Sequence, residues 1–299
     1  MVELVTSLLG WYACNSAFNV VNKVALEAWP YPWVVAWLQL AVGAALVVPL
    51  WFLRLRARPA VDAAFVLRNF GPIGALHAFG HGSQVLAFGA GSVFTANVVK
   101  ALEPVVGTVV GWACLGATPK PRATLALAPV VGGVVYAASK PGAAFDVGDF
   151  ADAPARAALA STVAFAFAKV LAKRLMTPAQ KRARALTAPN VYALLTCCSC
   201  ASLAAPALAL QGGAAAAALP AAGALAPVAL SGALYYASNE FSFRVLDALG
   251  PVPQAVANAA KRVFVLAAAV AFLGEAPTRR KVAGSAVALA GVLAYGLAK

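Results

Sequence analysis

The sequence contains few charged residues for its length. Only 11% of its 299 residues are Asp, Glu, Lys or Arg, whereas 62% are hydrophobic. Because a soluble domain carries about 25% charged residues, this chain has too little polar surface to cover a globule in water. Its apolar surface needs lipid instead. We therefore predict an all-α, polytopic membrane protein whose largest partner is the lipid bilayer.

Acidic residues and histidines are especially scarce. The ten Asp and Glu are scattered along the chain, which has two His. Phosphotransfer or hydrolytic chemistry needs a general base or carboxylates that hold a metal, so we expect neither an enzyme nor a cofactor. Three of the five cysteines, Cys197, Cys198 and Cys200, share one apolar run without a nearby histidine. This pattern favours buried, inert thiols over a metal site.

The excess charge is positive, with a formal net charge of +13. Nucleic-acid binding is one interpretation of a basic chain, but these basic residues do not form one exposed arm. Many lie in short loops between apolar runs, twelve on one predicted face and five on the other. Since cytoplasmic loops carry an excess of Lys and Arg, we place both termini on the cytosol-like face. No nucleic-acid partner is expected.

Apolar runs of about 20 residues, the length that crosses a bilayer, occur along the whole chain. Gly and Pro separate them, as at Pro30–Tyr31–Pro32. They predict about ten transmembrane helices in a single transporter domain of residues 1–299: 4–27, 33–53, 68–89, 92–116, 122–139, 155–176, 189–211, 224–246, 251–273 and 279–297.

An internal repeat divides the chain into halves of about 1–140 and 155–299. Leu115–Gly116–Ala117–Thr118–Pro119 is similar to Leu273–Gly274–Glu275–Ala276–Pro277, at an offset of 158 residues. Each half then holds five spans, and an odd number forces the second copy to insert upside down. Inverted repeats are typical of secondary transporters, which bind substrate at the midplane between the halves. Chance similarity of Ala-, Gly- and Val-rich helices is the alternative.

Several basic residues lie within predicted spans, where each costs about 2.5–3.5 kcal/mol at the bilayer centre. The acidic residues near them, such as Glu103 and Glu240, can neutralise only part of this charge. Lys261–Arg262 is the sharpest case, about ten residues into a span, and together the pair offers a point charge and a planar fork that suit phosphate. If the helix started later, this pair would lie at the membrane–water interface instead. The six residues are Lys23, Lys100, Lys169, Arg244, Lys261 and Arg262.

Lys100 is the counterpart of this pair in the first half. By the repeat offset, position 100 corresponds to Asn258, one turn from Lys261, so the two basic segments should face each other across a pseudo-twofold axis. Glu103 lies on the same helical face as Lys100 and could simply neutralise it. Lys23 is either a helix-end anchor or a gating residue.

Polar groups recur on two other spans. His77 and His81 have the i,i+4 spacing that can hold zinc, but no third ligand is apparent, so hydrogen bonding to a ligand is favoured. Tyr235, Ser238 and Asn239 lie one turn apart and serve either a substrate or helix–helix contacts.

Five segments together resemble the plastid phosphate translocators, a family within the drug/metabolite transporter superfamily. The resemblance covers nearly the whole chain in order. The segments are Asn15–Ser16–Ala17–Phe18–Asn19–Val20–Val21–Asn22–Lys23, His77–Ala78–Phe79–Gly80–His81, Lys100–Ala101–Leu102–Glu103–Pro104, Asn190–Val191–Tyr192–Ala193, and Asn258–Ala259–Ala260–Lys261–Arg262–Val263–Phe264–Val265.

The resemblance implies ten helices in inverted repeats and exchange of inorganic phosphate for phosphorylated compounds across the inner plastid envelope. It implies that Lys100, Lys261 and Arg262 hold the phosphate and that His81 contacts the rest of the substrate. Lys-Ala-Leu-Glu-Pro and the presence of His81 favour triose phosphate or 3-phosphoglycerate.

The chain departs from the family pattern at three places. A family arginine falls on Ala168, with Lys169 one place later, and a family tyrosine falls on Ser238. Gln84 replaces a small hydroxyl residue. The candidate substrate-binding residues are therefore Lys100, Lys261, Arg262, His81, Gln84, Lys169, Tyr235, Ser238 and Asn239.

Other functions stay open at this point. A nucleotide-sugar or other sugar-phosphate carrier of the Golgi or endoplasmic reticulum would also need cations for phosphate. The first apolar run is too long for a signal-peptide core, so we expect targeting to be internal or to reside in a segment absent from this chain.

Overall fold

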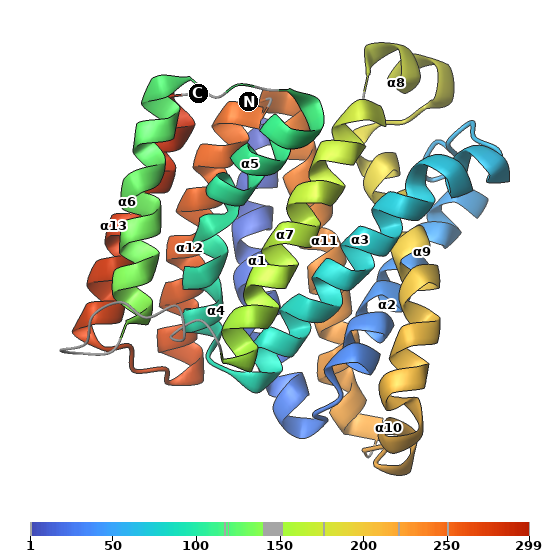
Figure 1. The fold of residues 1–299 in the computed structure, drawn as a ribbon. Coiled ribbons are helices and arrows are strands. Elements are labelled where there is room, and N and C mark those ends of the chain that lie inside the picture. Colours follow the sequence, from blue (N-terminus) through green and yellow to red (C-terminus); the bar gives the residue numbers. More distant parts are fainter. Residues whose placement is uncertain are drawn as a thin grey trace.

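The computed structural model describes residues 2–116, 118, 120–139, 152–175, 177–220, 222–249 and 251–298 (Figure 1). These residues form helices joined by short connections, with no β-strand among them. The elements are α1 (Val2–Ala28), α2 (Pro32–Phe52), α3 (Ala63–Ala90), α4 (Val93–Val99), η1 (Lys100–Leu102), α5 (Glu103–Leu115), α6 (Pro121–Ala138), α7 (Ala153–Leu175), α8 (Pro178–Arg184), α9 (Ala188–Ala207), η3 (Leu208–Gly212), α10 (Gly213–Ala217), α11 (Ala222–Leu249), α12 (Pro251–Leu273) and α13 (Arg279–Ala298).

A long helix or helical run coincides with each predicted span, and the prediction of a helical membrane protein is confirmed. Five segments are long and apolar enough to cross a bilayer, namely Pro32–Phe52, Val93–Cys114, Pro121–Ala138, Ala188–Ala217 and Arg279–Ala298. The other long helices, α1, α3, α7, α11 and α12, have 23 to 28 residues. They carry most of the polar residues predicted for the site. The count of ten spans stays a prediction.

The fourth predicted span is a broken helix rather than a continuous one. A 3₁₀ turn at Lys100–Leu102 separates α4 from α5. Pro104 accounts for the break, because proline lacks an amide hydrogen and its ring clashes with the carbonyl four residues earlier. That carbonyl belongs to Lys100, so the break coincides with the predicted basic residue.

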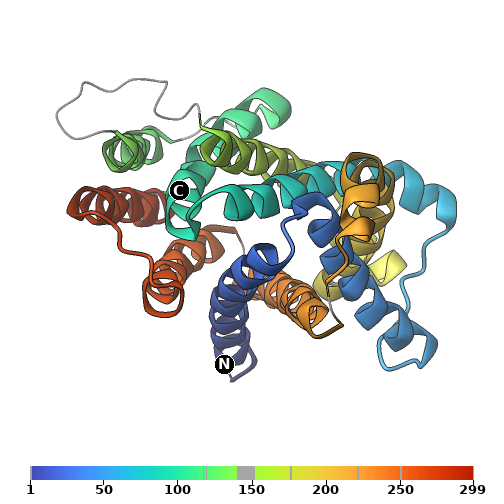
Figure 2. The ribbon, with the colours of Figure 1, turned by 90° about the horizontal axis from the view of Figure 1, so that it is seen from below.

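Helices from the two halves pair with each other. α1 packs along α11, α3 along α7, and α6 along α13, with the last pair at one side of the bundle (Figures 1 and 2). A twofold axis that exchanges the halves would convert the first of these pairs into the second and map the third onto itself. The pairing therefore supports the inverted repeat, which remains a prediction. Both termini lie at the same end of the bundle, as predicted (Figure 1).

The α6–α13 pair depends on glycines that let the two backbones touch. A Cβ atom at Gly284 would lie 2.5 Å from the carbonyl oxygen of Gly133, and one at Gly133 would meet the backbone of Ala288. At Gly132, the preceding residue, a Cβ would meet nothing within 4 Å. Small residues of this kind allow close packing of helices in membranes.

We expect Gly133→Ala to lower the free energy of unfolding by about 2 kcal/mol, the usual cost of overpacking. Gly132→Ala is the matched control and should be neutral or slightly stabilising, because alanine favours helix over glycine. Denaturant titration in mixed micelles measures both values. Equal effects of the two variants would contradict the close α6–α13 contact.

Candidate functional site

The break between α4 and α5 places Glu103 against α12 of the other half. Its Oε2 accepts hydrogen bonds from Arg262 at 2.8 Å and from Asn258 at 3.2 Å. Arg262 is buried, with 5% of its surface exposed. The two basic segments that the repeat offset predicted to face each other therefore lie side by side. Their link is an ion pair between the halves, in which Arg262 is the partner of Glu103.

Lys100 faces α3 and α7. Its Nζ donates a hydrogen bond to Gln84 Oε1 and lies 5.3 Å from the centre of the Phe165 ring. Gln84 is three residues after His81, so both side chains lie on the same face of α3. Gln84 therefore links Lys100 to the face of α3 that carries His81.

Lys261 and Arg262 point in different directions, as adjacent residues of a helix must. The Lys261 ammonium lies 5.1 Å from the ring centre of Trp11 on α1, whereas Arg262 points to α5. A ring face attracts a cation and partly replaces its hydration. The structure thus brings Lys100 and Arg262 to one region and directs Lys261 toward α1.

His81 lies at the centre of the bundle and is fully buried. Its ring stacks on Tyr235, with ring centres 3.9 Å apart. Within the described part of the chain, neither ring nitrogen has a hydrogen-bond partner. Buried polar atoms in this condition are uncommon and call for an explanation such as a ligand.

The remaining predicted residues are placed differently. Ser238 Oγ and Asn239 Nδ2 both donate to the carbonyl of Tyr235, at 3.1 and 2.9 Å. These bonds stay within α11, and a substrate contact of Ser238 or Asn239 stays a prediction. The backbone of Lys169 belongs to α7, but its side chain lies outside the described part of the structure.

Lys23 has a structural role in this conformation. Its ammonium donates to the carbonyls of Phe88 and Gly91, at 3.1 and 3.0 Å, where α3 ends. A cation at this position compensates the unpaired carbonyls of a helix C-terminus. Of the two interpretations of Lys23, the helix-end anchor fits these contacts.

Asn97 is a site residue that the sequence pattern did not reveal. Together with Arg262 and Ser285 it lines a small pocket between α4, α12 and α13. Its amide donates to Asn19 on α1 at 3.2 Å. Its position three residues before Lys100, on the same helical face, is the feature of the sequence that could have indicated this role.

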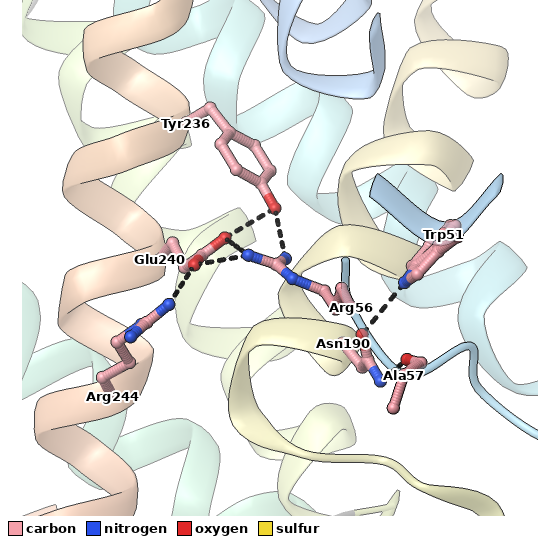
Figure 3. A network of polar contacts seen from close by, with 7 residues as sticks. All are labelled: Trp51, Arg56, Ala57, Asn190, Tyr236, Glu240 and Arg244. Atoms are coloured by element: carbon pink, nitrogen blue, oxygen red, sulfur yellow. Dashed lines mark hydrogen bonds and ion pairs between the residues drawn. The ribbon is translucent and has the colours of Figure 1, made fainter. Parts of the chain in front are cut away.

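Arg56 was also missed, because its sequence position indicated only a loop. Figure 3 shows Glu240 between Arg56, from the connection between α2 and α3, and Arg244 of its own helix. Both Arg56–Glu240 oxygen contacts are short, 2.7 and 2.9 Å, and Tyr236 donates to the same carboxylate at 2.8 Å. Burial lowers the pKa of the Arg56 guanidinium, but the hydrogen bond and charge of Glu240 outweigh it and raise the pKa.

A second carboxylate joins the two halves at the opposite end of the bundle. Glu275, in the connection between α12 and α13, accepts hydrogen bonds from the Ser92 hydroxyl at 2.6 Å and from the backbone amides of Val93 and Phe94 at 2.8 and 2.9 Å. These groups are at the start of α4, where a carboxylate favourably meets the helix dipole. Contacts between the halves thus occur at both ends of the region that holds Lys100 and Arg262.

The sequence matches the model of the Triose-phosphate Transporter family over residues 2–296. The chain belongs to the Triose-phosphate Transporter family. It is therefore a membrane transporter and not an enzyme, and the resemblance noted from its motifs is confirmed.

Three similar members of the Triose-phosphate Transporter family differ in their named substrates. The triose phosphate/phosphate translocator of Flaveria trinervia is 29% identical over 97% of this chain and 70% of its own length. The phosphoenolpyruvate/phosphate translocator 1 of Oryza sativa subsp. japonica is 30% identical, with the same coverage of both chains. The glucose-6-phosphate/phosphate translocator 2 of Arabidopsis thaliana is 27% identical over 97% of this chain and 73% of its own. All three are named as chloroplastic proteins.

A solved crystal structure has a similar fold. The match covers 98% of this chain and 94% of the other chain, with a TM-score of 0.54 at 16% sequence identity. This similarity supports the helical architecture alone.

Proposed function

We propose that this chain is an antiporter that exchanges inorganic phosphate for phosphorylated C3 compounds, triose phosphate or 3-phosphoglycerate, in a plastid membrane. The observation that carries the proposal is the meeting of cationic α4–α5 and α12 segments deep in the bundle. Lys100 and Arg262 lie there with Glu103. The named activities of the relatives, all of them phosphate translocators, support the same class of substrate.

In this proposal a phosphate group binds to Lys100, Lys261 and Arg262. The guanidinium of Arg262 can present two parallel N–H donors to phosphate oxygens, and each ammonium adds a point charge. Arg262 would exchange part of its contact with Glu103 for the substrate. Lys261 would turn from Trp11 toward the same space. We propose that residues 1–299 form a single transporter domain, and the family match over residues 2–296 supports this.

Exchange rather than one-way transport follows from the charge of the site. The proposed site contains three cations, Lys100, Lys261 and Arg262, and one carboxylate, Glu103. Moving this net positive charge through a closed, dry state without substrate is unfavourable. A phosphate dianion offsets that charge, so the loaded carrier reorients. Alternating access further requires that the Arg56–Glu240 contacts and the Glu275 contacts open in turn, because they close opposite ends of the bundle.

The test is uptake of labelled phosphate into proteoliposomes. We expect vesicles preloaded with phosphate, triose phosphate or 3-phosphoglycerate to take up label on the order of 100-fold faster than empty vesicles, the rate ratio that a few kcal/mol of uncompensated charge produces. Equal rates in empty vesicles would refute strict exchange.

A panel of external competitors discriminates the candidate substrates. Triose phosphate and 3-phosphoglycerate should compete with labelled phosphate more strongly than phosphoenolpyruvate, glucose 6-phosphate or a nucleotide sugar. Stronger competition by the nucleotide sugar would favour the alternative of a Golgi or endoplasmic-reticulum carrier.

A further inference from the structure

His77, one turn before His81 on α3, lies within hydrogen-bond distance of side chains on two other helices, α9 and α11. The Ser199 hydroxyl donates to the carbonyl of Leu195 at 2.7 Å, which leaves its oxygen as an acceptor. His77 Nδ1 lies 3.0 Å from that oxygen, and we therefore assign the proton to Nδ1, which donates to Ser199. His77 Nε2 is then an acceptor.

Tyr235 completes this chain of hydrogen bonds. Its hydroxyl is 3.2 Å from His77 Nε2 and donates to it. Donors and acceptors therefore run in one direction, from Tyr235 on α11 through His77 on α3 and Ser199 on α9 to a backbone carbonyl. All three side chains are buried, so the bonds are protected from competition by water and fix the Tyr235 ring with respect to three helices.

The fixed ring of Tyr235 in turn supports His81. The two rings are stacked, with an interplanar angle of 28°. The ring of Phe18 on α1 also packs against Tyr235, with ring centres 5.1 Å apart. Stacking holds the plane of the imidazole but makes no bond to its edge. Among the residues that the structure describes, neither nitrogen of His81 has a hydrogen-bond partner. His81 shares its face of α3 with Gln84, which accepts a hydrogen bond from Lys100.

We infer that His77 is a positioning residue for substrate selection: through Tyr235 it orients the edge of His81 toward the organic part of the phosphorylated substrate. The inference rests on the proposed function and deepens it. It also revises the role predicted for Tyr235, whose hydroxyl bonds to His77 and whose ring supports His81. The proposed function places inorganic phosphate on the cations and the organic part of the substrate at His81, so the arrangement should affect phosphate esters and leave inorganic phosphate nearly unaffected.

The experiment compares two exchange reactions in proteoliposomes, phosphate for phosphate and triose phosphate for phosphate. We expect His77→Leu and Tyr235→Phe to raise the KM for triose phosphate about tenfold, the effect of losing one buried hydrogen bond, and to change the KM for phosphate less than about twofold. His77→Gln should restore the wild-type value, since its amide can accept from Tyr235 and donate to Ser199. This restored variant keeps the test meaningful if His77→Leu folds poorly.

Ser202→Ala is the matched control. Ser202 also lies on α9 and also donates to a backbone carbonyl of its own helix, that of Cys198 at 2.8 Å, but it belongs to no chain of bonds to His77. It should change neither KM. Equal shifts of both KM values in His77→Leu and Tyr235→Phe, no shift at all, or failure of His77→Gln to restore selectivity would overturn the inference while phosphate exchange by the wild type persists. Absence of phosphate exchange in the wild type would overturn the proposed function, and this inference with it.

Discussion

Arg262→Ala should lower the rate of phosphate exchange by on the order of 100- to 1,000-fold. Arg262 is 5% exposed, and in the proposed site its guanidinium pairs with the substrate phosphate. Truncating one partner of a buried, hydrogen-bonded charge pair at a binding site costs about 3–4 kcal/mol, which corresponds to a rate change of this size. The measurement is kcat/KM from initial rates in proteoliposomes preloaded with phosphate. The exchange rate of Arg262→Lys should fall between those of the wild type and Arg262→Ala, because lysine keeps the charge and loses the planar fork.

A double variant separates substrate binding from a structural role of Arg262. If the guanidinium only neutralises Glu103, to which it donates at 2.8 Å, then Glu103→Gln combined with Arg262→Gln removes both charges and should recover transport. If the guanidinium binds phosphate, the double variant stays inactive although it folds. We expect the second result.

Arg122→Ala provides the control for loss of positive charge. Arg122 is the second residue of α6 and is exposed, so the change should leave exchange within about twofold of the wild type. A comparable loss of transport in Arg122→Ala would mean that net charge, and not the position of Arg262, determines the rate.

The meeting of Glu103 and Arg262 could be predicted because two sequence signals agree. Basic residues in apolar runs must lie inside the protein, and the repeat offset aligned position 100 with Asn258, which contacts Glu103 in the structure. The broken helix could also have been foreseen, since Pro104 excludes a regular helix through Lys100. Patterns within single segments and the repeat offset between the halves were sufficient for these features.

The partners of Tyr235 and Arg56 could not be predicted in the same way. The spacing of polar residues on α11 shows which side chains share a face, but not that the Tyr235 hydroxyl meets His77 of α3. Arg56 lies between two spans, where a basic residue is explained by topology alone. Its contact with Glu240 depends on how the α2–α3 connection folds back onto α11, which is a property of the packed bundle.

The Glu240 network leads to a second large effect, this time on stability. Glu240 is the single acceptor shared by Arg56, Tyr236 and Arg244 in Figure 3. Glu240→Gln keeps the shape of the side chain but removes the charge and replaces one acceptor oxygen by an amide donor facing a guanidinium. We expect the free energy of unfolding to fall by about 3 kcal/mol, because a mostly buried arginine loses its counter-charge.

Arg244→Ala is the matched control within the same network. The Arg244 side chain is 48% exposed, whereas those of Arg56 and Glu240 are 17% and 11% exposed. An exposed i,i+4 pair contributes under about 1 kcal/mol, so Arg244→Ala should be much milder than Glu240→Gln in the same micelle titration. If the two variants are equally mild, Glu240 does not fasten the α2–α3 connection to α11, and the contact can open at little cost during transport. If Glu240→Gln is instead the more destabilising variant, as we expect, breaking the Arg56–Glu240 contact costs substantial free energy. Substrate binding must then offset that cost when this end of the bundle opens.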